Sequence, residues 1–130
     1  MYIVGDFANL TKIKEYEEIA KKLEHLDIAM LFLNAGTSTP GPFLDVSTKS
    51  IEDTLNVNAL HPAYLSKVLL NKQLSRGKRS AIVVTSSGFG LYPAPGSSIY
   101  SSSKAFATFL GQGLNYELKG KIDVMAFICG

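Results

Sequence analysis

The sequence has a single cysteine, Cys129, so it can form no internal disulfide. No cysteines and histidines have the spacing of a zinc site, and we expect no metal ligand set. A lone cysteine fits a reducing compartment. The longest basic run is Lys21–Lys22 and the formal net charge is +2, which argues against a nucleic-acid partner.

No apolar stretch is long enough to span a membrane. The N-terminus also lacks the basic-then-apolar pattern of a signal peptide. We therefore expect any membrane anchor to lie outside these residues.

The composition is that of one globular domain spanning residues 1–130, with 46% apolar and 18% charged residues. Short apolar runs alternate with longer amphipathic ones, which predicts βα units and a parallel sheet. We expect strands at 2–4, 28–33, 81–85 and 122–128, and helices at 11–26, 47–55, 58–74 and 100–118. Ser47 is a suitable N-cap for the second helix, and Pro62 is tolerable only in a first turn or at a kink.

Tyr100 and Lys104 are four residues apart on a predicted helix and so share one face. An ammonium beside a phenol favours the phenolate and lowers the tyrosine pKa from about 10. A tyrosine of this kind can exchange a proton with a substrate oxygen near neutral pH. The alternative is an ordinary Tyr–Lys pair on a solvated helix face.

Three more polar positions accompany predicted strands and helices. Ser87 follows an apolar strand and could hold a substrate carbonyl, although a serine there is more commonly a turn residue. Asn34-Ala35-Gly36 follows the buried strand 28–33, and open α/β sheets bind ligands beyond the carboxyl ends of their strands. The alternative is that these three residues form a simple turn. Asn58 could also be a helix cap.

Taken together, these segments closely resemble the short-chain dehydrogenase/reductase family. Ser86-Ser87-Gly88 and Tyr100 to Ala105 resemble its active-site segment. Asn34-Ala35-Gly36 resembles its Asn-Asn-Ala-Gly motif, with Leu33 in place of the first asparagine, and Asn58 matches its active-site asparagine. Four motifs in the same order and at similar spacing are more specific than any one alone.

The resemblance implies hydride transfer between a nicotinamide and a carbonyl carbon. Tyr100 is then the general acid in reduction and the base in oxidation, and Lys104 lowers its pKa and binds the nicotinamide ribose. Ser87 orients the substrate oxygen, and the backbone of Asn58 helps to hold a proton-relay water. The implied cofactor-binding residues are Asp6, which would contact the adenine ring, with Asn34, Ala35, Gly36, Tyr100 and Lys104.

The segments around Asp6, Asn34 and Ser87 look most like the branch that reduces 17-ketosteroids and very-long-chain 3-oxoacyl-CoA. That branch implies NADP(H) rather than NAD(H) and a cytoplasmic or endoplasmic-reticulum-associated protein. It also implies a homodimer through helices 58–74 and 100–118. Apolar candidates for the dimer seam are Tyr64, Val68, Phe106 and Phe109, although each could face the sheet instead.

The sequence departs from the family in lacking the Gly-rich phosphate loop, which normally binds pyrophosphate at a helix N-terminus. We therefore expect an incomplete, Rossmann-like three-layer fold that lacks the first two strands and the last strand. The strand at Tyr2 would then have lost its neighbours, so it could lie elsewhere, pair with another strand or leave an open edge. A catalytically silent interaction or scaffold subunit is the alternative to an enzyme.

Overall fold

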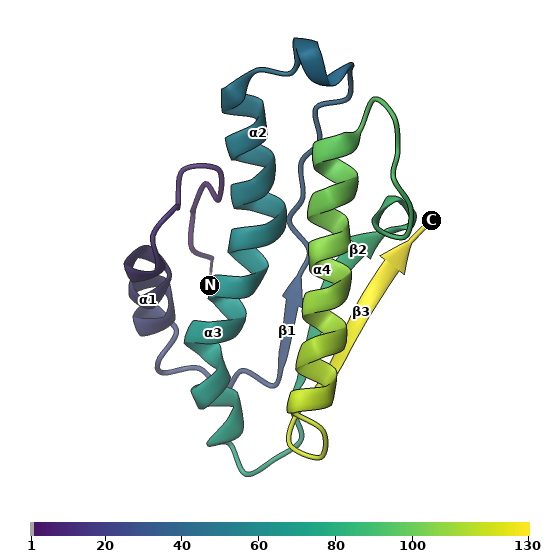
Figure 1. Ribbon diagram of the computed structural model, residues 1–130. Helices are drawn as coiled ribbons and strands as arrows, with labels where there is room; N and C mark the ends of the chain where they lie inside the picture. The colour runs from purple at the N-terminus through teal and green to yellow at the C-terminus, as the bar shows by residue number, and fades with distance from the viewer. Residues whose placement is uncertain (1) are drawn as a thin grey trace.

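The computed structural model describes residues 2–130 and contains a three-stranded parallel sheet (Figure 1). The strands are β1 (Met30–Leu33), β2 (Ala81–Ser87) and β3 (Asp123–Cys129), in the order β1-β2-β3. Met30 pairs with Ala81, which pairs with Asp123. Each crossover between neighbouring strands contains a helix, as parallel pairing requires. The predicted Rossmann-like α/β sheet is confirmed for these three strands.

Four α-helices precede or connect the strands: α1 (Ile13–Lys22), α2 (Thr48–Leu55), α3 (His61–Leu74) and α4 (Ser98–Glu117). The Ser47 hydroxyl oxygen accepts a hydrogen bond from the Ser50 N–H at 3.1 Å, which confirms the predicted N-cap of α2. A carboxylate oxygen of Glu15 accepts the N–H groups of Thr11 and Lys12, at 2.9 and 2.8 Å. This capping places the first turn of α1 later than the predicted start.

The predicted helix 58–74 is joined to α2 through a π-helical turn, η2 (Asn56–Leu60). The N–H of His61 donates to the carbonyl of Asn56, five residues back. Pro62 follows in the first turn of α3. Because proline has no N–H, it cannot donate to the carbonyl of Asn58, which is the α-helical partner of that position. Of the two predicted places for Pro62, a first turn or a kink, the structure has the first turn, with the π-helical turn immediately before it.

The helices lie over one face of the sheet (Figure 1). Alternate strand residues, including Leu33, Ile82 and Val124, are buried in a core that also contains Leu69 of α3 and Ala107 of α4. Residues of the opposite face stay exposed: Met30 (55%), Phe32 (61%), Met125 (52%) and Phe127 (49%). Residues 2–130 thus supply the sheet and one helical layer of the expected three-layer fold.

The predicted strand at Tyr2–Val4 is wrong, because the described residues of this segment form no strand. Tyr2 and Val4 are both 88% exposed. A strand needs a neighbour for its backbone N–H and C=O groups, and the family strands that would lie between this segment and β1 are not among residues 2–130. Side chains hold the following loop instead: the Asn56 amide donates to the Ala8 carbonyl at 2.9 Å, and the Phe7 ring stacks on His61 at 3.8 Å.

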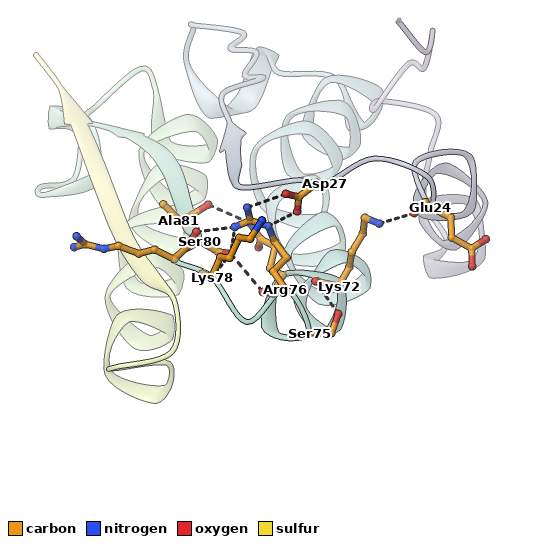
Figure 2. Close-up of polar contacts among 10 residues, drawn as sticks. Glu24, Asp27, Lys72, Ser75, Arg76, Lys78, Ser80 and Ala81 are labelled. Atoms are coloured by element: carbon orange, nitrogen blue, oxygen red, sulfur yellow. Dashed lines mark hydrogen bonds and ion pairs between the residues drawn. The ribbon is translucent and has the colours of Figure 1, made fainter.

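At the end of the sheet where the strands begin, Arg76 joins three segments (Figure 2). Its guanidinium donates to both carboxylate oxygens of Asp27, at 2.5 and 3.2 Å, and lowers the pKa of that carboxyl. It also donates to the Arg79 carbonyl at 2.6 Å and the Ser80 hydroxyl at 2.8 Å. Arg76 therefore fixes the loop before β1 against the start of β2.

None of the helices in residues 2–130 has the length and apolar character needed to cross a membrane. Within the same residues, no cluster of three or more histidine, cysteine or acidic side chains could hold a metal ion.

Candidate active site

The sequence-predicted motifs meet at the end of the sheet where the parallel strands finish. A pocket of about 390 Å³ opens there. Its lining residues come from the carboxyl ends of β1, β2 and β3 and from the first turns of α4: Asn34, Gly36, Thr37, Ser38, Thr85, Ser86, Ser87, Tyr100, Lys104, Cys129 and Gly130. This is the position at which open α/β sheets bind ligands.

Lys104 is the one charged side chain among the described residues that line the pocket, and 5% of its surface is exposed. Its Nζ donates to the carbonyl of Thr85 at 3.1 Å and lies 5.7 Å from the centroid of the Tyr100 ring. Burial lowers the pKa of the Lys104 ammonium. The pairing of Tyr100 and Lys104 inferred from their spacing therefore exists at the pocket wall rather than on a solvated helix face.

Gly36 lies against Lys104. A Cβ at this position would be 3.2 Å from the Lys104 Nζ and 3.6 Å from the Asn58 Oδ1. The φ of Gly36 is not in the left-handed region, so the backbone conformation does not require glycine here, and the relevant feature is the close approach to Lys104. The missing side chain of Gly36 leaves room at the pocket floor for the lysine ammonium and for any ligand bound above it.

Asn58 is 2% exposed, and its side chain is a bridge rather than a free reactive group. Its Oδ1 accepts the Thr37 N–H at 2.8 Å, while its Nδ2 donates to the Thr37 carbonyl at 2.8 Å and to the Ser103 hydroxyl at 3.0 Å. The amide thus ties the loop after β1 to α4. The π-helical turn and Pro62 leave its backbone carbonyl without the usual α-helical donor.

Ser87 ends β2 and caps a short 3₁₀ turn, η3 (Gly88–Gly90), by accepting the Phe89 N–H at 3.3 Å. That turn packs directly on α4. A Cβ at Gly90 would lie 2.8 Å from the carbonyl carbon of Lys104, and the Ser86 hydroxyl donates to the Lys104 carbonyl at 2.8 Å. Ser86 and Gly90, which flank Ser87 and the start of η3, therefore hold this segment against the backbone of Lys104.

The remaining predicted positions differ in how close they lie to the pocket. Asn34 lines it and accepts the Thr85 hydroxyl at 3.1 Å, whereas Ala35 does not line it. Asp6 lies outside, where its carboxylate accepts the Ala8 N–H at 3.0 Å and the Asn9 amide at 2.7 Å. Its contact with an adenine ring stays a prediction.

Sequence reasoning assigned no individual role to several supporting residues, although two of them, Ser86 and Ser103, lie within the motifs that it quoted: Thr37, Ser86, Gly90 and Ser103. Each acts through a contact with a residue far along the chain, such as the 45-residue separation between Asn58 and Ser103. Serine and threonine at these positions carry no sequence signal that separates them from turn or helix residues. Pro62 was the one available signal, because it marked an irregular turn beside Asn58.

Comparison with known families identifies the family of this chain. The model of the short chain dehydrogenase family matches residues 1–130, and the chain belongs to that family. Within the family its sequence is similar to that of very-long-chain 3-oxoacyl-CoA reductases. It is 37% identical over 123 residues to the enzyme of that name from Anas platyrhynchos, covering 92% of this chain and 38% of the relative.

Two solved structures share both the fold and part of the sequence. The bulky-bulky ketone specific alcohol dehydrogenase from Comamonas testosteroni superposes with a TM-score of 0.85 and 33% identity, over 97% of this chain and 50% of that one. A short-chain dehydrogenase from Sphingobium yanoikuyae in complex with NADPH superposes with a TM-score of 0.83 and is 31% identical in sequence. The match covers 95% of this chain and 48% of that one. The chain therefore spans between about a third and a half of the length of these relatives.

Proposed function

We propose that these residues form the catalytic half of a nicotinamide-dependent ketone reductase that can also run as an alcohol dehydrogenase. The observation that carries the proposal is the buried Lys104 beside the Tyr100 ring, in a pocket that also contains Ser87. A buried cation is costly unless it is used or paired, and among described residues Lys104 meets a backbone carbonyl rather than a carboxylate.

The side chains can carry out the proton half of a ketone reduction. The Ser87 hydroxyl donates a hydrogen bond to the substrate oxygen and orients it. The Tyr100 hydroxyl transfers its proton to that oxygen as the carbonyl becomes an alcohol. The charge of Lys104 stabilises the resulting phenolate, and burial strengthens this effect by excluding water. The backbone carbonyl of Asn58, which lacks its usual α-helical donor, would hold a water that returns a proton.

The described residues fit the nicotinamide end of a dinucleotide. Asn34 and Gly36 at the end of β1 would lie along the cofactor, and Tyr100 and Lys104 would contact its ribose. The fit rests on the pocket at the carboxyl edge of the sheet and on the space left by Gly36. The bound nicotinamide would supply or accept the hydride. NADP(H) is the proposed form, and the NADPH complex of the Sphingobium yanoikuyae relative supports it.

The proposed substrate is a long-chain 3-oxoacyl-CoA, with a 17-ketosteroid as the second possibility within the same branch. The similarity to very-long-chain 3-oxoacyl-CoA reductases supports the first. Both substrates carry a ketone with a large apolar neighbour, which the Ser87–Tyr100 arrangement can accept.

A homodimer through α3 and α4 remains part of the proposal. Phe106 and Phe109 on α4 are 43% and 72% exposed, so they are available for such a seam. Tyr64 and Val68 on α3 pack against the core, and the Tyr64 ring makes an edge contact with Tyr16 of α1. The proposed seam therefore rests on α4 rather than on these two α3 side chains.

The direct test uses the full-length protein and measures NADPH oxidation with a long-chain 3-oxoacyl-CoA. Tyr100→Phe removes the proton donor and should lower kcat by at least about a hundredfold, since general acid catalysis contributes about 10²–10⁴-fold. NADPH affinity, measured by fluorescence titration, should stay nearly unchanged. Tyr116→Phe is the matched control, because Tyr116 lies on the same helix and is 79% exposed.

If Tyr100→Phe retains the wild-type rate, the proposed mechanism is wrong. If the wild-type protein binds NADPH but reduces no 3-oxoacyl-CoA or ketosteroid, the substrate proposal fails. Absence of both binding and turnover would favour the silent interaction subunit. Cofactor titration of the 130-residue chain then shows whether its own loops suffice for binding.

A further inference from the structure

The helical turn that carries Tyr100 is weakly secured from within its own helix. Ser97, the N-cap residue of α4, makes no side-chain cap hydrogen bond among the described residues, in contrast to Ser47 at the start of α2. The first N–H groups of a helix have no intrahelical partner, so an uncapped first turn relies on contacts with other elements. Tyr100 is the third residue of α4, and its position therefore depends on what holds this turn.

The ring of Tyr100 makes two contacts that a shift of this turn would disturb. The Phe89 ring meets it edge-to-face, with centroids 6.3 Å apart and planes at 80°. The Lys104 Nζ lies 5.7 Å from the centroid of the Tyr100 ring. Neither contact is a hydrogen bond to the Tyr100 hydroxyl, so the position of that hydroxyl follows from the backbone of the turn.

Ser103 anchors this backbone. It is 1% exposed, and its hydroxyl donates to the Tyr100 carbonyl at 2.7 Å. The same oxygen accepts a hydrogen bond from the Asn58 Nδ2 at 3.0 Å. Since the Asn58 amide also bonds to the backbone of Thr37, a continuous path of hydrogen bonds runs from the loop after β1 to the backbone of Tyr100.

Ser101, two residues before Ser103, makes the same kind of local bond. Its hydroxyl donates to the carbonyl three residues back, that of Ser98, at 3.1 Å, and the residue is 5% exposed. Such a bond is an ordinary feature of serine within a helix. Ser103 differs in its second bond, which reaches 45 residues along the chain to Asn58. A purely local role in the helix does not explain that second bond.

We propose that Ser103 is a positioning residue, which anchors the first turn of α4 to Asn58 and so places the Tyr100 hydroxyl for proton transfer. The inference rests on the proposed function. Lys104 has a separate hold, because its Nζ donates to the Thr85 carbonyl at 3.1 Å. Loss of the Ser103 hydroxyl should therefore move the proton donor more than the lysine proposed to contact the nicotinamide ribose.

Kinetics of the full-length protein with NADPH and a long-chain 3-oxoacyl-CoA test this anchor. Ser103→Ala should lower kcat by about 10-fold to 100-fold, because a small misplacement of a reacting group is costly. The KM and the dissociation constant of NADPH should change by less than about threefold, since the lost interaction acts on the chemical step. Ser101→Ala is the matched control, and its kcat should stay within about threefold of wild type. An equal loss of kcat in both variants, or no loss in Ser103→Ala, would overturn the inference.

A second comparison shows whether Ser103 acts through Asn58. In an Asn58→Ala background the distant hydrogen bond is already absent. Ser103→Ala should then lower kcat by less than about threefold, because residues that act through one another have non-additive effects. A loss as large as that in the wild-type background would show that Ser103 acts within the helix alone, and it would overturn the anchor.

NMR of tyrosine labelled at Cζ separates this inference from the proposed function, because it needs no turnover. The Tyr100 resonance, identified by its loss in Tyr100→Phe, should shift in Ser103→Ala as the ring moves relative to Phe89 and Lys104. It should stay in place in Ser101→Ala. A resonance that shifts in this way in a protein that reduces no ketone supports the anchor, and the proposed function then fails alone. No shift in Ser103→Ala, or an equal shift in both variants, rejects the anchor.

Discussion

The side-chain amide of Asn58 makes two hydrogen bonds to the backbone of Thr37: it accepts the Thr37 N–H and donates to the Thr37 carbonyl, both at 2.8 Å. A third bond, to the Ser103 hydroxyl at 3.0 Å, extends the link to α4. The loop after β1, the π-helical turn and the helix that carries Tyr100 and Lys104 are therefore joined through one buried amide.

Replacing Asn58 should damage both stability and activity. Asn58→Ala leaves the N–H and carbonyl of Thr37 and the buried Ser103 hydroxyl without this partner, and should cost about 2–4 kcal/mol of unfolding free energy. Urea unfolding of the full-length protein measures this loss. Asn56→Ala is a control on the same turn, because Asn56 makes one bond, to the Ala8 carbonyl, at a partly buried site. A similar cost for both variants would argue against the bridging role of Asn58.

Adding a single methyl group at Gly36 should impair the pocket. The Gly36→Ala Cβ would lie 3.2 Å from the Lys104 Nζ, which is closer than a normal contact, so the ammonium beside Tyr100 has to shift slightly. We expect kcat to fall by about 10-fold or more, because small misplacement of a catalytic group is costly. The change is measured as steady-state ketone reduction, together with NADPH affinity.

Gly113→Ala is the matched control for Gly36→Ala. Gly113 lies in α4 and a Cβ there would meet nothing within 4 Å. Since alanine favours a helix over glycine by about 1 kcal/mol, this variant should be as active as wild type and equally or more stable. Full activity in Gly36→Ala would show that Lys104 needs no such clearance.

The buried His61 should make stability depend on pH. His61 is 3% exposed, neither ring nitrogen has a partner in the described residues, and burial lowers its pKa to about 4 from the usual 6.5. His61 is therefore protonated below about pH 6.5 in the unfolded chain but only below about pH 4 in the folded protein. Stability should fall as pH falls through this window, by at most about 3 kcal/mol.

Chemical denaturation at several pH values between about 4 and 7 measures this dependence. His61→Leu should reduce the slope of unfolding free energy against pH by up to about 1.4 kcal/mol per pH unit, which corresponds to one proton. His25→Leu should leave the slope as it is, because His25 is exposed. An unchanged slope in His61→Leu would assign the acid sensitivity to other groups.

Local features of the fold were predictable because their causes are local. The apolar runs at 28–33, 81–85 and 122–128 each overlap with a strand of the parallel sheet, and Ser47 caps α2. The strand predicted at Tyr2–Val4 had a suitable pattern, but a strand also needs a partner for its backbone, and no sequence pattern supplies one. The sequence indicated the π-helical turn only indirectly, because Pro62 disfavours a straight helix at that point.

The gathering of the site at one edge of the sheet also followed from sequence, because the carboxyl ends of parallel strands lie together. The sequence by itself therefore determined which segments form the site: the motif ending at Gly36, Ser87 after its strand, and Tyr100 with Lys104 one helical turn apart. Only the tertiary structure decided that Gly36 makes room for the lysine, that Asn58 is a bridge to Thr37, and that Phe89 meets Tyr100. These contacts join residues 11 to 68 positions apart, and packing in three dimensions selects such partners where local backbone preference cannot.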